Sequence, residues 1–218
     1  MVFQSLDNPS LLVANLLVLL VAMTIHEFAH NYVGWRMGDP TPAQTGRLTL
    51  NPFVHINWVG WLMFALIGFG ILGSAPISPW RMPSENRRWR WLAAVAAGPV
   101  SNLLLAILFG LIVRVVGFGT FASLPDVIFY IFTQMVTLNV LLFVFNLLPL
   151  FPIDGWQIVY ALLPPDLASW WERNRQTTQY IFFGLLLLSF FPLPGIPNLF
   201  GIIIGQPVNF LVGLILGV

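Results

Sequence analysis

Two histidines and a glutamate stand close together in the segment His26-Glu27-Phe28-Ala29-His30. On an α-helix, side chains four residues apart share a face and are separated by about 6 Å along the axis. Both imidazoles can therefore bind one zinc ion, with the glutamate between them placed to act as a general base. The alternative is a pair of packing histidines beside a buried acid, which is disfavoured because ionisable residues in apolar helices are costly and usually functional.

A catalytic zinc site needs a third protein ligand and keeps one position for water. The chain contains no cysteine, so the third ligand must be the remaining histidine, His55, or a carboxylate. Asp154 is favoured, because it follows an apolar run that ends in two prolines and irregular backbone. Such backbone lies at membrane depth only where it packs in protein or lines a polar cavity. The alternative is that Asp154 is an acidic residue of a turn at the membrane interface and binds no metal.

The composition shows that the elements holding these residues are membrane helices. Of 218 residues, 58% are hydrophobic and 8% are charged, whereas soluble domains carry about 25% charged residues. The mean hydropathy of +0.85 and the long uncharged runs indicate that lipid is the solvent. A soluble enzyme and a disordered chain are thereby excluded. The net charge of +1, without a basic tract, excludes a nucleic-acid binder.

Apolar runs of about 20 residues predict the membrane spans. Four strong runs and one shorter run predict spanning helices near 11–36, 89–116, 126–148, 178–192 and 198–218. Residues 46–51 include an alternation of polar and apolar residues, which predicts a short β-hairpin. The expected fold is a single all-α polytopic domain over residues 1–218, with about five spans, a re-entrant segment and this hairpin near the active site.

The re-entrant segment follows from the positions of the ligands. His26 and His30 lie near the end of the first predicted helix, and Asp154 follows the run 126–148. One metal ion can bind all three only if both helix ends lie on one side of the membrane. Residues 58–74 are therefore predicted to dip into the membrane or to lie along its surface. Eight of the nine arginines then lie on the metal side, which the positive-inside rule assigns to the cytoplasm.

Five motifs occur along the chain in an order that resembles the site-2 protease family of intramembrane zinc metalloproteases. The resemblance is to the short prokaryotic form of this family, without extra soluble domains. The resemblance covers about residues 12–163. His26-Glu27-Phe28-Ala29-His30 is followed by Gly38-Asp39-Pro40-Thr41, by Gly46-Arg47-Leu48-Thr49-Leu50-Asn51-Pro52 with His55, by Gly98-Pro99-Val100-Ser101-Asn102, and by Asn-x-x-Pro-x-x-Pro-x-Asp-Gly from Asn146 to Gly155.

The resemblance implies that His26, His30 and Asp154 bind one zinc ion and that Glu27 is the catalytic base. Asn146 matches a family asparagine that holds substrate backbone near the metal. Asn102 matches a polar family residue; its role is either to contact substrate or an oxyanion, or to form an interhelical hydrogen bond.

Two further features concern the substrate loop. Residues 46–51 resemble a re-entrant β-element that presents substrate, for which strand addition to an exposed edge gives a physical reason; the alternative is a plain structural hairpin. His55-Ile56-Asn57-Trp58 departs from the family pattern His-Ile-Asp-Pro. This departure affects the expected conformation of the substrate loop and leaves the expected zinc ligands intact.

The expected protein is an intramembrane zinc metalloprotease that hydrolyses peptide bonds in or beside the transmembrane segment of membrane-anchored signalling or regulatory proteins. Its expected partners are that substrate and the lipid bilayer. The resemblance places it in a prokaryotic cell membrane, and the apolar runs and the arginine distribution predict a multi-pass protein with its active site toward the cytoplasm. The alternatives are a membrane zincin that cleaves non-transmembrane peptides, a catalytically silent zinc-binding relative and a zinc carrier.

Overall fold

A computed structural model describes residues 7–67, 70, 73–191, 193, 195 and 197–217 of the chain. Four of its helices are long and apolar enough to cross a membrane: α1 (Pro9–Arg36), α5 (Arg87–Val116), α7 (Asp126–Asn146) and α11 (Leu199–Leu216). They match four of the five predicted spans. The all-α membrane architecture expected from the sequence is thus confirmed.

The predicted count of five spans is corrected to four candidate spans within the described residues. The fifth predicted run lies in α10 (Arg175–Phe190), which has 16 residues. At 1.5 Å per residue this helix is about 24 Å long, shorter than the hydrocarbon core of about 30 Å. Its first five residues are also polar, from Arg175 to Gln179.

The predicted β-hairpin at residues 46–51 is wrong. Local turns bind the backbone there: Arg47 N donates to Pro42 O at 2.8 Å, and the Asn51 side chain accepts from Phe53 N at 3.1 Å, which caps the next helix. Within the described residues, β-pairing is limited to a single antiparallel bridge between Ile56 and Gly73.

Shorter helices connect the spans. They are α2 (Thr41–Gln44), α3 (Pro52–His55), α4 (Trp58–Ile67), the 3₁₀ turn η2 (Pro79–Arg81), α6 (Phe118–Ala122), α8 (Asp154–Leu162) and α9 (Pro165–Arg173). With ten residues, α4 is about 15 Å long and cannot cross the membrane as a helix. Part of the predicted re-entrant segment 58–74 lies outside the described residues, so re-entry stays a prediction.

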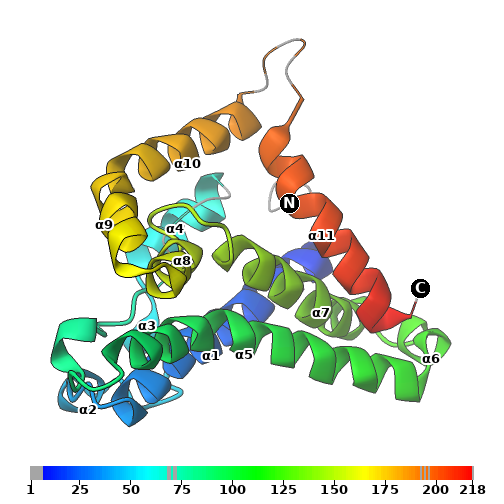
Figure 1. Cartoon of the computed structure of the whole chain (residues 1–218). Coiled ribbons are helices and arrows are strands. Elements are labelled where there is room, and N and C mark those ends of the chain that lie inside the picture. Colours follow the sequence, from blue (N-terminus) through cyan, green and yellow to red (C-terminus); the bar gives the residue numbers. More distant parts are fainter. Residues whose placement is uncertain are drawn as a thin grey trace.

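The spans α1, α5 and α7 pack against one another, and α11 packs on α7 and α5 (Figure 1). Val18 and Leu19 of α1 and Met135 and Leu138 of α7 form one of the buried apolar clusters between these helices. The helix α8 packs on α5. Because α7 packs on α5 and runs in the opposite direction, the loop after α7 lies beside the second half of α1.

Candidate active site and metal centre

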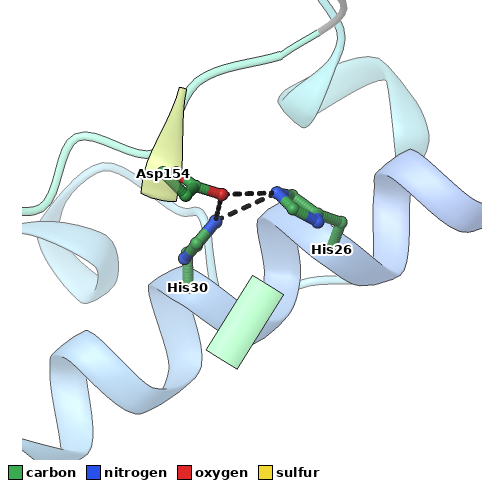
Figure 2. A group of neighbouring side chains, drawn as sticks. All are labelled: His26, His30 and Asp154. Carbon is green, nitrogen blue, oxygen red and sulfur yellow. Dashed lines mark hydrogen bonds and ion pairs between the residues drawn. The ribbon is translucent and has the colours of Figure 1, made fainter. Parts of the chain in front are cut away.

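Three predicted ligand residues from two separate segments meet at one point (Figure 2). His26 and His30 project from one face of α1, and their Nε2 atoms lie 3.0 Å apart. Asp154 is the first residue of α8, and its Oδ2 lies 3.2 Å from His26 Nε2 and 3.1 Å from His30 Nε2. A tetrahedral zinc ion with bonds of about 2.0 Å separates its ligand atoms by about 3.3 Å. The triangle therefore has nearly the size that zinc requires.

The loop before α8 determines where Asp154 lies. Ile153 is extended, with φ −82° and ψ 155°, and the helix begins at the next residue. A Cβ at Gly155 would lie 2.5 Å from the carbonyl carbon of Leu147. Glycine is therefore required where the loop folds back over the start of α8, which explains the Asp-Gly pair at this position.

The far nitrogen of each imidazole is hydrogen-bonded to an oxygen. His26 Nδ1 lies 2.7 Å from Asn102 Oδ1, and His30 Nδ1 lies 2.9 Å from the Ala94 carbonyl oxygen. Because these oxygens only accept, both Nδ1 atoms carry the proton. Each Nε2 atom, which faces Asp154, is then the nitrogen that binds a metal once it has released any proton, the arrangement usual for metal-binding histidines.

The surroundings of Asp154 favour its ionised form. Burial by itself raises the pKa of this carboxyl, but the charge of His30 and the hydrogen bonds from both imidazoles outweigh burial and hold the pKa well below its ordinary value. A carboxylate binds a metal ion only when it is deprotonated. Asp154 is thus present in the form that a ligand requires.

Glu27 is buried, with 4% of its surface exposed. Its Oε2 atom has no hydrogen-bond partner in the part of the chain that the structure describes. A Cβ at Gly73 would lie 2.7 Å from the other carboxyl oxygen, Oε1, so this glycine leaves space beside the acid. An unpartnered buried carboxyl oxygen is unfavourable, and a water or substrate group in the adjoining cavity would satisfy it.

A cavity of 740 Å³ contains this site. The side chains around the metal centre form one part of its wall, and residues of α7, α8 and α10 form another. Residues 73–75 and 77–78 form the wall beside Glu27. The site therefore opens into a space large enough for several residues of an extended peptide.

Three polar side chains fasten the wall at residues 74–78. Asp39, which is 0% exposed, accepts from Ser78 N at 2.8 Å. Arg47 donates to Ser74 O at 2.8 Å, and Arg81 donates to Pro76 O at 2.9 Å. Asp39 is not among the residues predicted from the sequence to form the site. Its place in the Gly-Asp-Pro-Thr motif was the one sequence signal for a functional role.

The other sequence candidates lie in different places. Asn146 lines the cavity and donates to Leu142 O at 2.9 Å. Asn102 is 0% exposed and lies behind His26 rather than in the cavity wall. His55 is not part of the three-ligand group; its Nε2 lies 2.7 Å from Thr49 O, where it holds the loop before α3.

Gly98 of α5 is predicted to be essential for the metal site. A Cβ at this position would overlap His30 Nε2 and would lie 2.8 Å from His26 Cε1. Gly98→Ala is therefore expected to displace both imidazoles and to weaken zinc binding at least about tenfold, as lost ligand orientation does at other metal sites. Zinc titration in detergent measures this effect. Gly184→Ala is the control, since a Cβ there meets nothing within 4 Å. Equal zinc affinity in both variants would contradict the arrangement.

Comparison with known proteins identifies relatives in bacteria. "Putative zinc metalloprotease YwhC" of Bacillus subtilis is 38% identical over 183 residues, which cover 81% of this chain and 80% of that protein. Rip2 of Mycobacterium tuberculosis, named in the same way, is 33% identical over 178 residues, 78% of this chain and 64% of Rip2. The chain thus spans slightly less than two thirds of Rip2. No protein-family model and no solved structure matches the chain.

The four apolar helices, the three-ligand group and these relatives together define a membrane-bound zinc metalloprotease. The chain belongs to the site-2 protease family of intramembrane zinc metalloproteases.

Proposed function

We propose that this chain cleaves peptide bonds in or beside the transmembrane segment of membrane-anchored signalling or regulatory proteins. The observation that carries the proposal is the placement of His26, Glu27 and His30 on a helix long enough to span the membrane, with Asp154 closing the group. A substrate in the bilayer can approach such a site without leaving the lipid. In this proposal the three ligands hold one zinc ion.

Each residue has one chemical role in the proposed reaction. His26, His30 and Asp154 would hold the zinc ion, which would supply the Lewis acidity that activates water and polarises the scissile carbonyl. Glu27 accepts the proton of the attacking water and passes it to the leaving amide nitrogen. Asn146, in the cavity wall, offers its amide to the substrate backbone.

A helical substrate must unwind before it is cleaved, because its carbonyls are bound within the helix. The wall at residues 74–78 supports a way to hold the unwound strand. Asp39, Arg47 and Arg81 bind backbone groups of residues 74, 76 and 78. Ala75 and Ile77 alternate with these residues, and their peptide groups form no hydrogen bond within the described part of the chain. Strand addition, first expected at 46–51, is therefore proposed for 74–78.

The proposal is tested with one scissile sequence presented in two forms. A tethered single-span substrate in proteoliposomes is compared with a soluble peptide of the same sequence. We expect cleavage of the membrane form alone, its loss with a chelator and its return with zinc. Equal cleavage of both forms would favour a zincin that acts on non-transmembrane peptides. Bound zinc without cleavage of a panel of such substrates would favour a silent relative.

The proposed orientation predicts that residues 74 and 87 lie on one side of the membrane and residue 114 on the other. The chain contains no cysteine, so Ser74→Cys, Arg87→Cys and Arg114→Cys each create a single labelling site. In cells, Ser74→Cys and Arg87→Cys should react only after a membrane-impermeant reagent gains access to the cytoplasm. Arg114→Cys should react from outside. Labelling of the first two from opposite sides would contradict re-entry of 58–74.

A further inference from the structure

A chain of buried amides connects α7 to a ligand histidine on α1. Asn139 lies in the middle of α7 and is 0% exposed. Its Oδ1 accepts from Asn102 Nδ2 of α5 at 2.9 Å. Asn102, also 0% exposed, presents its Oδ1 to His26 Nδ1 at 2.7 Å. Among the described residues, the side-chain hydrogen bonds of Asn139 go to Asn102 and Met135 and not to the ligand group, so Asn139 reaches that group through Asn102.

Backbone carbonyls determine the direction of every hydrogen bond in this series of buried amides. Asn139 donates from Nδ2 to Met135 O at 2.8 Å. Since a carbonyl oxygen cannot donate, the nitrogen of Asn139 must face it and the oxygen must face Asn102. Asn102 donates to that oxygen and also to Ala22 O at 3.3 Å. Its own oxygen is thereby left for His26.

We propose that Asn139 is a positioning residue of the metal centre. Through Asn102 it keeps His26 protonated on Nδ1, so that Nε2 offers its lone pair beside His30 and Asp154. The inference rests on the proposed metal site and adds a residue that contacts neither metal nor substrate. Asparagine in an apolar span also joins helices by hydrogen bonds, but that role alone predicts no effect on the tautomer of His26.

The test combines imidazole NMR with zinc titration. The chain has only three histidines, so ¹⁵N-histidine labelling of zinc-free protein, at a pH high enough for the imidazoles to be neutral, reports the tautomer of each. In Asn139→Leu, Asn102 loses the nearer of the two acceptors that orient it and keeps only Ala22 O at 3.3 Å. We expect His26 to populate both tautomers and zinc affinity to fall about tenfold, the lower end of the range for groups that orient metal ligands. Asn139→Asp keeps the acceptor for Asn102 and should restore both readings to near the wild-type values.

Thr137→Val is the matched control, because its hydroxyl bonds only Thr133 O of the same helix, at 3.0 Å. It should change neither reading. The inference is overturned if Asn139→Leu leaves the His26 tautomer unchanged, whether or not zinc affinity falls. If the proposed metal site itself were wrong, His26→Ala would bind zinc as tightly as the wild type. That outcome is therefore distinct from a failure of the Asn139 inference.

Discussion

Replacement of Glu27 by glutamine is expected to lower kcat for a single-span substrate about 10³-fold while zinc stays bound. General-base catalysis contributes about 10²- to 10⁴-fold to enzymatic rates. Glutamine has nearly the same shape as glutamate but cannot accept the proton of the attacking water. The three ligand side chains are unchanged, so zinc binding does not depend on the carboxylate. The variant therefore separates chemistry from metal binding.

The measurement is single-turnover cleavage in proteoliposomes, with zinc quantified in the same preparation by atomic absorption. Glu85→Gln is the control, because Glu85 is an exposed acid that is not among the residues lining the cavity. Its rate should stay within about twofold of wild type, since it has no part in the proposed reaction. Loss of zinc from Glu27→Gln would assign Glu27 to the metal site instead, and full activity would require another base.

Removal of the Asp154 carboxylate is expected to weaken zinc binding more than about 100-fold. Even groups that only orient metal ligands contribute 10- to 100-fold to affinity, and Asp154 Oδ2 lies within 3.2 Å of both imidazoles. Asp154→Ala would leave two neutral nitrogen ligands and no anionic ligand to balance the charge of the ion. Proteolysis should disappear together with zinc.

Competition with a chromophoric chelator gives the affinity of Asp154→Ala. Asp166→Ala, an exposed acid in the first turn of α9, is the control and should bind zinc as the wild type does. His55→Ala is measured beside them, because histidine was the alternative third ligand. If Asp154→Ala kept its affinity and His55→Ala lost it, the ligand assignment would be wrong.

The helices that carry the site could be predicted because their signals are local. The apolar runs match α1, α5, α7 and α11 closely; for example, the run 198–218 contains α11 (Leu199–Leu216). The spacing of His26 and His30 places both imidazoles on one helical face whatever α1 packs against. Local signals gave a wrong prediction where the same sequence pattern is compatible with two backbone structures. At residues 46–51 the alternation suited a strand, but turns and an asparagine cap bind the same backbone.

The sequence by itself determined the membrane setting, the histidine pair with its glutamate, and the candidates for the third ligand. Only the tertiary structure decided which groups meet them, because these contacts join residues far apart in the chain: His26 and Asn102 are separated by 76 positions, and His30 and Asp154 by 124. Helical periodicity determines which way a side chain points but not which neighbour it meets. In lipid, close packing and hydrogen bonds between helices decide that pairing. Asn139 and Asp39 acquire their roles from these contacts alone.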